Sequence, residues 1–387
     1  MLNNKSFCAA PFFRLTMRTS GALLPCCNYS SDQNSINIRD VRLEDYFDGA
    51  VMQQVKADML AGVPVKQCAT CYTAEATWNY SMRTDFNRKH EKELADIVNT
   101  NQLRTIELHL GNYCNLKCLM CFSQDSSAML TENIELKLDT TPQQYFTFDN
   151  NTFDAMFESI EKHIDQIEVL DLRGGETMII PQVKQWLTAI DPEVAKRLTI
   201  KIQSNGTVFN ESWRNIFLKF KTVELALSVD AFGALNEYIR FPGNWQQFND
   251  NLQKFKSIDT VQLAINSTIS NLNWLRVEQL LDWYAKDDNT FHLAVLHSPN
   301  YHLFTNLPKP LLARHLPIIK QYSHRFNNEI TTNQIHELIA TVENYLDNAV
   351  EDTALWLEFC RVITLRDAYR GNSIFDQLPE LKDYWVE

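Results

Sequence analysis

Short strand patterns alternate with longer helical patterns between residues 103 and 300, and this alternation restricts the possible folds more than any other feature. We predict strands at 105–110, 167–173, 198–203, 223–229, 261–268 and 291–296. Helical patterns at 152–164, 181–190, 211–220, 244–256 and 273–285 fall between most of them. Repeated strand–helix units form a parallel sheet with helices outside. Since six strands are too few for a closed eight-stranded barrel, we expect an α/β fold, an open and partial (β/α)6 TIM-like barrel.

Different patterns flank this predicted barrel, which we place at 103–305. Residues 1–80 contain a predicted hairpin, a helical stretch and five cysteines, so we expect a small separate module there. Residues 81–102 are predicted to be a linker helix, and residues 306–387 a helical extension. The segment 125–150 is predicted to be a long polar insertion.

Charge and hydropathy exclude several classes of partner. The formal net charge of −12 gives no general attraction to phosphate backbones, so nucleic acid is not an expected partner. No segment approaches the roughly 18 uninterrupted apolar residues of a membrane-spanning helix, and the N-terminus lacks a signal-peptide pattern. We therefore expect a cytoplasmic protein with reduced thiols. Eight of the nine cysteines lie within residues 8–121, which favours metal ligands over disulfides.

Three cysteines follow the first predicted strand directly. Cys114, Cys118 and Cys121 are separated by three and then two residues. A closed structural zinc site needs four ligands, and a cubic iron–sulfur cluster has four irons. Three cysteines would therefore leave one iron of such a cluster open to another ligand.

Small polar residues follow the other predicted strands. A Gly-Gly-Glu sequence comes after the second strand, and Ser204-Asn205 follow the third. The fourth strand ends near Ser228 and Asp230. Active sites of parallel α/β folds lie at the carboxyl ends of the strands. We therefore expect one edge of the fold to collect three thiols, a carboxylate and small polar groups, which suits a cofactor with amine, carboxylate and ribose groups.

The Cys-x3-Cys-x2-Cys loop followed by Gly-Gly-Glu resembles the radical S-adenosylmethionine (SAM) enzymes over roughly residues 103–300. The resemblance implies a [4Fe-4S] cluster on Cys114, Cys118 and Cys121, with SAM bound to the fourth iron. It also implies that an electron, delivered by a reductase or flavodoxin-like donor, cleaves SAM to a 5′-deoxyadenosyl radical. That radical would take a hydrogen atom from the substrate.

The resemblance further implies a set of SAM-binding residues. Glu176, beside Gly174 and Gly175, would accept hydrogen bonds from the methionine amino group. The carboxylate and ribose groups would be bound by polar side chains further along the chain: Ser204, Asn205, Ser228, Asp230 and Arg240. For Arg240, a surface position is an equally open interpretation.

The N-terminal cysteines also resemble a known module, the auxiliary-cluster "twitch" form of the SPASM domain. The pattern consists of Cys8, Cys26, Cys68 and Cys71, with Cys27 as an alternative to Cys26. It implies one auxiliary [4Fe-4S] cluster, although four thiolates also suit a structural zinc. In this chain the module precedes the predicted barrel, whereas in familiar relatives it follows the barrel.

The expected activity is hydrogen abstraction from a substrate C–H bond, followed by oxidation through the auxiliary cluster. A peptide or protein substrate is slightly favoured by the resemblance, and a small sugar or alcohol is the alternative. A non-catalytic iron–sulfur or zinc protein is the competing hypothesis. Glu107 and His109 share one face of the first strand and could either contact substrate or be structural. No catalytic acid or base is assigned from the sequence.

Overall fold

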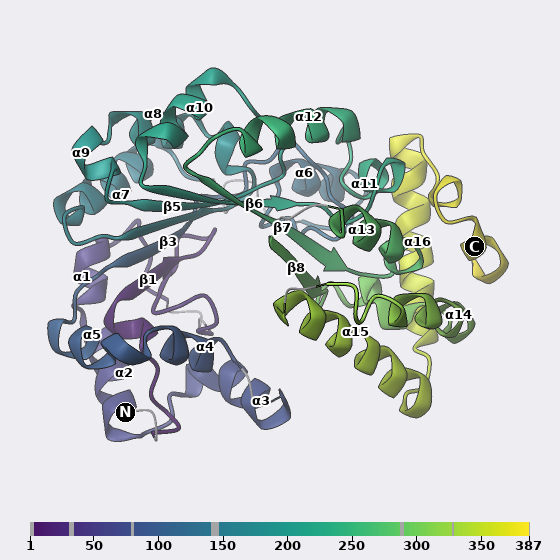
Figure 1. Ribbon diagram of the computed structural model, residues 1–387, viewed down its shortest axis with the longest axis horizontal. Coiled ribbons are helices and arrows are strands. Elements are labelled where there is room, and N and C mark those ends of the chain that lie inside the picture. The colour runs from purple at the N-terminus through teal and green to yellow at the C-terminus, as the bar shows by residue number, and fades with distance from the viewer. Residues whose placement is uncertain are drawn as a thin grey trace. The chain divides into compact units, whose positions relative to one another are not determined.

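The computed structural model describes residues 4–30, 35–78, 81–140, 147–286, 290–326 and 329–386 (Figure 1). Eight strands form one sheet in the order β2-β1-β3-β4-β5-β6-β7-β8. Their bounds are β1 Arg14–Met17, β2 Leu23–Leu24, β3 Thr105–His109, β4 Val169–Arg173, β5 Thr199–Ser204, β6 Thr222–Ser228, β7 Val261–Ile269 and β8 Thr290–Val295. The pairs β1–β3, β3–β4, β4–β5 and β7–β8 are parallel. The predicted α/β class with a mostly parallel sheet is therefore confirmed.

The N-terminal hairpin is part of this sheet. Strands β1 and β2 are antiparallel, as the hairpin pattern predicts. Strand β1 also pairs in parallel with β3, so that Thr16 lies opposite Glu107. The sheet therefore gains a parallel strand beyond the six predicted ones, because the backbone groups along β3 accept a partner on that side. The predicted domain boundaries at residues 80, 102 and 305 stay predictions.

The chain forms two compact units. The first unit comprises Met1–Tyr113, Pro142–Ile202 and Ser212–Val223. The second comprises Cys114–Thr141, Gln203–Glu211 and Glu224–Glu387.

The first unit contains strands β1 to β4 and a group of short helices. These helices are α1 Leu43–Phe47, α2 Ala50–Ala61, α3 Ala69–Trp78, α4 Met82–Lys89, α5 Leu94–Thr100, α7 Asn150–His163, α8 Pro181–Ala189 and α9 Pro192–Ala195. The sheet has two chemically different faces here. Ile106, Leu108, Leu170 and Leu172 are fully buried, while Glu107, His109, Asp171 and Arg173, which alternate with them, are polar or charged. Because side chains of a strand alternate between faces, one face joins the apolar core and the other carries charge.

The second unit contains β7, β8 and the C-terminal helices. Its helices are α6 Ser127–Glu135, α11 Ala234–Ile239, α12 Trp245–Lys256, α13 Val277–Tyr284, α14 Lys309–Lys320, α15 Glu329–Asn348 and α16 Thr353–Arg370. The predicted helical extension contains α14, α15 and α16. Helix α10 Glu211–Lys219 straddles the boundary between the units. Among the described residues, no helix is long and apolar enough to cross a membrane.

Helix α6 differs from the prediction of a polar insertion. Its Glu132 is fully buried and pairs with two arginines of α16, Arg366 at 2.5 Å and Arg370 at 2.9 Å. Arg370 also donates a hydrogen bond to the carbonyl oxygen of Lys117, at 2.7 Å. The charged residues of α6 suggested an exposed segment, but the compensating charges come from more than 230 positions later in the chain.

Replacing Glu132 with Gln should destabilise the fold strongly. The substitution leaves two buried guanidinium groups without their carboxylate, a change that typically costs about 3–5 kcal/mol. Urea denaturation should report this loss. The control is Glu358→Gln, which breaks the exposed pair with Arg361 on α16 and should cost roughly 0–1 kcal/mol. Equal losses in the two variants would contradict the structural role of Glu132.

Candidate active site

The loop that carries the three predicted cluster cysteines is anchored by its backbone. Lys117 N–H donates to the carbonyl oxygen of Phe241 at 2.6 Å, and Leu119 N–H donates to that of Ile239 at 2.8 Å. The Ser126 hydroxyl donates to the carbonyl of Leu116 at 2.7 Å. These bonds attach both sides of the loop to fixed elements of the second unit, so the cysteine positions do not depend on side-chain packing alone.

The three thiols lie within electrostatic reach of one another. Cys118 is buried, while Cys114 and Cys121 are half-buried. Burial raises the pKa of Cys121 well above its usual value, and the neighbouring Cys118, Asp125 and Cys114 raise it further. Thiolates gathered in this way repel each other unless a cationic group compensates them. Metal ions supply such charge and displace the thiol protons, so this donor set fits an iron–sulfur cluster.

Arg240 stands beside these cysteines rather than on the surface. Its Nη1 donates to Asp230 Oδ2 at 2.6 Å, and its side chain is 13% exposed. Burial lowers the pKa of Arg240, but Cys118, Asp230 and Cys121 together raise it above the usual value. Its Nε is buried and has no hydrogen-bond partner within the described part of the chain. A charged donor without a partner fits a carboxylate ligand.

The other predicted SAM-binding residues of the second unit make contacts within the protein. Asp230 Oδ1 accepts from the Thr268 N–H at 2.9 Å, so both carboxylate oxygens of Asp230 have protein partners. Asn205 Nδ2 donates to Asn115 Oδ1 at 2.9 Å, which ties the segment after β5 to the cysteine loop. Ser204 is buried and accepts from a backbone N–H. Ser228 is the half-buried last residue of β6. Asp230 and Asn205 thus position Arg240 and the loop.

The Gly-Gly-Glu segment lies in the first unit, where it packs against the residues that precede the cysteine loop. Gly174 has a φ of +136°, and a Cβ there would lie 2.7 Å from the carbonyl oxygen of Gly111. Glu176 N–H donates to the Tyr113 carbonyl at 2.8 Å. The Glu176 side chain is fully buried, and its Oε1 accepts from the Met178 N–H at 3.0 Å. Only glycine permits this close approach of two backbones.

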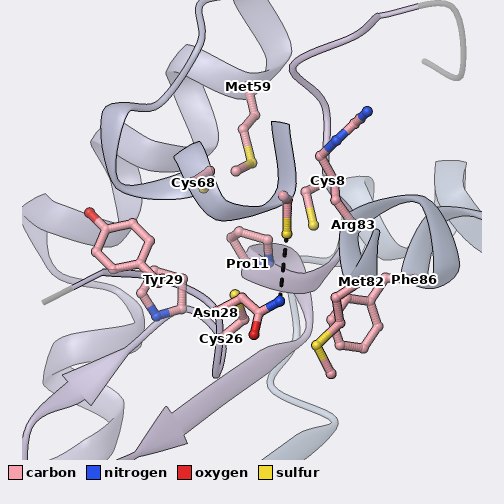
Figure 2. A pocket seen from close by; sticks show the side chains of 12 residues that line it. Cys8, Pro11, Cys26, Asn28, Tyr29, Met59, Cys68, Met82, Arg83 and Phe86 are labelled. Carbon is pink, nitrogen blue, oxygen red and sulfur yellow. Dashed lines mark hydrogen bonds between the residues drawn. The ribbon is translucent and has the colours of Figure 1, made fainter. Parts of the chain in front are cut away.

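The predicted auxiliary cysteines gather around a second site (Figure 2). Cys8, Cys26, Cys68 and Cys71 all line one pocket in the first unit, together with Met59, Met82, Arg83 and Phe86. They come from four places: the segment before β1, the end of β2, the 3-10 turn Lys66–Cys68 and helix α3. Cys27 is absent from the lining, and its Sγ lies 3.4 Å from Met82 Sδ. The structure therefore brings Cys26, not Cys27, to the other three.

Electrostatics in this pocket match those of the first cysteine group. Burial raises the pKa of Cys26 and of Cys68 each to about 11. The pKa of Cys8 is raised well above its usual value by burial and by Cys26, Cys68 and Cys71. In the described ranges, no three His, Cys, Asp or Glu side chains converge closely enough to hold a metal ion.

Helix α4 holds the segment that carries Cys8. Asn87 Oδ1 accepts from the Ala9 N–H at 2.8 Å, and Asn87 Nδ2 donates to the Phe7 carbonyl at 2.9 Å. Arg83 donates to the same carbonyl at 2.6 Å and pairs with Glu75 of α3. The sequence analysis had assigned this region to a linker because its polar residues suggested an exposed helix. Their partners are backbone groups about 80 positions earlier, which no local pattern reveals.

A cluster of charged side chains covers the polar face of β1, β3 and β4. Glu107 bonds to Arg14, to Thr16 at 3.3 Å and to His109 Nε2 at 2.9 Å. Asp171 makes a two-pronged pair with Arg173, at 2.9 and 3.0 Å. We call these six residues the polar cluster. Only Glu107 and His109 were singled out from the sequence; the available signal for the others was charge at alternating positions of buried strands.

Glu107 is ionised within the polar cluster. Burial opposes ionisation, but the hydrogen bond from His109 and the charges of Arg173 and Arg14 lower the pKa of Glu107 well below its usual range. Burial and the nearby Glu107 charge raise the pKa of Cys27 to about 12. The negative charge of Glu107 in the polar cluster therefore acts on the Cys27 thiol.

Comparisons with known proteins agree with the motifs. No known family model matches the chain. A curated relative, the cysteine-type anaerobic sulfatase-maturating enzyme of Clostridium novyi (strain NT), is 22% identical over 185 residues, which are 46% of each chain. The match thus spans less than half of that relative. Streptococcus suis SuiB bound to S-adenosylmethionine covers 70% of this chain and 60% of its own (14% identity, TM-score 0.39). The radical S-adenosylmethionine methyltransferase TsrM from Kitasatospora setae covers 50% and 36% (12% identity, TM-score 0.36).

Both TM-scores lie below 0.5, so the similarity is argued from the curated relative alone. Together with the cysteine motif, this match supports the predicted similarity to the radical SAM enzymes.

The low pKa of Glu107 predicts a pH-dependent contribution to stability. A carboxyl whose pKa is lower in the folded state stabilises the fold above its unfolded pKa of about 4.3, and this stabilisation is lost as the pH falls below that value. Glu107→Gln should therefore be clearly less stable than the wild type at pH 7, with a difference that shrinks between about pH 5 and pH 3. Denaturation midpoints measure it. Glu168→Gln, at an exposed position before β4, should show no such convergence.

Proposed function

We propose that this chain is a radical SAM enzyme that removes hydrogen from a C–H bond of a peptide or protein and completes an oxidation. One observation carries the proposal most directly. Two of the three neighbouring thiols, Cys118 and Cys121, lie within electrostatic reach of a buried arginine, Arg240, whose Nε lacks a partner among the described residues. This pairing of cluster ligands with a carboxylate-binding donor is what a cluster that also binds an amino acid moiety requires.

The cofactors would be held by residues already described. Cys114, Cys118 and Cys121 would bind a [4Fe-4S] cluster, and Arg240 would bind the SAM carboxylate. Gly174, Gly175 and Glu176 would bind the methionine amino group, and Ser204, Asn205 and Ser228 the ribose. Asp230 would hold the Arg240 guanidinium in place through the 2.6 Å contact. When bound, these groups supply a 5′-deoxyadenosyl radical that takes a hydrogen atom from substrate.

The second group of cysteines is proposed to bind an auxiliary [4Fe-4S] cluster. Four thiols line the pocket, one for each iron of the cubic cluster. A cluster with every iron bound by cysteine has no open iron for substrate. Its role would then be to accept an electron, which favours a net oxidation. The alternative of a structural zinc is distinguished by metal analysis.

The proposed substrate is a peptide or protein side chain. The curated relative is named for the maturation of a sulfatase, which is a protein. A small sugar or alcohol is the second candidate, since the same chemistry applies to both. An electron donor such as a reductase or a flavodoxin-like protein would serve either substrate.

Anaerobic reconstitution tests the proposal directly. The loaded chain should bind about eight irons and, with dithionite and SAM, release 5′-deoxyadenosine even without substrate. Iron analysis and chromatography of the nucleoside measure both quantities. A chain that reaches eight irons and releases no 5′-deoxyadenosine would show that the proposal is wrong, and so would a chain that binds zinc and no iron.

Single cysteine variants should separate the two clusters. Cys8→Ala should lose about half of the iron while still cleaving SAM, because Cys8 belongs to the auxiliary pocket. Cys114→Ala should lose the other half together with SAM cleavage. The matched control is Cys27→Ala, which removes the neighbour of Cys26 outside the pocket and should keep the full iron content. Iron loss in Cys27→Ala equal to that in Cys8→Ala would contradict the assigned ligand set.

Arg240→Gln should weaken SAM binding with little change in iron content. A hydrogen bond to a charged group contributes about 1.5–3 kcal/mol, so the Kd for SAM should rise roughly tenfold to a hundredfold. Equilibrium binding to the reconstituted chain measures it. Arg276→Gln is the control, since Arg276 pairs with Glu380 outside the proposed site. An unchanged Kd in Arg240→Gln would remove Arg240 from the SAM site.

A further inference from the structure

The polar cluster lies one side-chain layer away from the auxiliary cysteine pocket. The Arg14 guanidinium lies over the Phe86 ring, 5.4 Å from its centre, and Phe86 lines the pocket. The Cys27 Sγ contacts Met82, another lining residue. The negative charge of Glu107 raises the pKa of Cys27. Figure 2 shows Met82 and Phe86 on one side of the group of cysteine side chains. The Arg14 side of the polar cluster therefore adjoins Phe86, which lines the site proposed to accept electrons.

The charges of the polar cluster compensate one another. Arg14 pairs with Glu107 and lies 3.6 Å from Asp171. Arg173 pairs with Asp171 and lies 3.6 Å from Glu107. The positive charges of two guanidinium groups thus face the negative charges of two carboxylates. His109 is the remaining titratable member of the polar cluster, and its side chain is 18% exposed.

The contact with Glu107 determines which nitrogen of His109 carries the proton. An ionised carboxylate only accepts hydrogen bonds, so the 2.9 Å contact with Glu107 Oε1 places a proton on Nε2. In the neutral imidazole, Nδ1 then carries the lone pair. No hydrogen bond to Nδ1 is found among the described residues. A carboxylate that orients an imidazole in this way makes the other nitrogen a proton acceptor.

We propose that His109, oriented by Glu107, is the base that receives the substrate proton when the auxiliary cluster receives the substrate electron. This inference rests on the proposed function and adds a catalytic residue to it. The substrate would be a carbon that bears an O–H, N–H or S–H group. Loss of one hydrogen atom from that carbon leaves a carbon radical. Formation of the C=O, C=N or C=S double bond then releases one electron, to the auxiliary [4Fe-4S] cluster, and one proton, to His109 Nδ1.

The proposal predicts coupling between cluster reduction and His109 protonation, which can be measured without a substrate. A protonated His109 stabilises the reduced cluster, so the midpoint potential should fall as the pH rises from about 5 to 8, where histidines ordinarily change charge. The charges facing His109 from β1, β3 and β4 come from Arg14, Glu107, Asp171 and Arg173, and Cys27 lies near Glu107.

Redox titration followed by electron paramagnetic resonance provides the test. Cys114→Ala serves as the background, so that only the auxiliary cluster is present. Adding His109→Asn should abolish the pH dependence, and His109→Gln should repeat the result. The control, His336→Asn, changes an exposed histidine of α15 and should keep the slope. A potential independent of pH in the background chain, or an equal slope after His109→Asn, overturns the proposal.

A second measurement needs no histidine variant and covers the case in which those variants lose their iron. Coupling between two sites is reciprocal, so reduction of the auxiliary cluster should favour the protonated form of His109. Diethyl pyrocarbonate acylates only unprotonated imidazole. In the fully loaded chain, mass spectrometry should find His109 modified more slowly, by roughly twofold or more, after electrochemical reduction than before it, with His336 unchanged. Equal rates overturn the proposal. A chain that binds only four irons overturns the auxiliary site itself and this inference with it.

Discussion

Thiolates buried beside other thiolates repel each other, and this repulsion is the constraint on which both proposed sites depend. In the auxiliary pocket, Cys26, Cys68 and Cys71 all oppose ionisation of Cys8, in addition to the cost of burial. Cys121 experiences the same opposition from Cys118 and Cys114. Without bound metal the favoured state is a set of neutral thiols, and metal binding releases their protons. If both groups bind clusters as proposed, loading should be coupled to proton release.

Buried charged and polar side chains hold these cysteines in place at both sites. Asn87 and Arg83 of α4 bind the backbone around Cys8. Arg370 of α16 binds the Lys117 carbonyl in the three-cysteine loop while it pairs with the buried Glu132. Such side chains fix a loop without adding apolar bulk, and each leaves a costly unpaired charge if its partner is removed. The ligands are thus positioned by elements distant in sequence.

Strand and helix positions between residues 103 and 300 were predictable because each element has its own hydrophobic period. All six predicted strands and the helices between them are present, with bounds that differ by a few residues. Helix α6 was missed because its buried Glu132 has its partners on α16. The sequence favoured Cys26 but left Cys27 as an alternative, since adjacent residues differ mainly in the direction of their side chains. The structure places Cys26 on the pocket and Cys27 toward Met82.

The sequence by itself determined the class of fold and which cysteines we propose as iron ligands, because hydrophobic period and cysteine spacing are local properties. Only the tertiary structure decided how charges are paired. Alternation shows that Glu107 and His109 share a face of β3, but the pairing of β1 with β3 brings Arg14 and Thr16 beside them. Parallel pairing joins segments that are 90 or more positions apart. No local sequence pattern specifies which residues of the two strands lie opposite each other. That register brings the charge of Arg14 to Glu107, the carboxylate that orients the proposed proton acceptor.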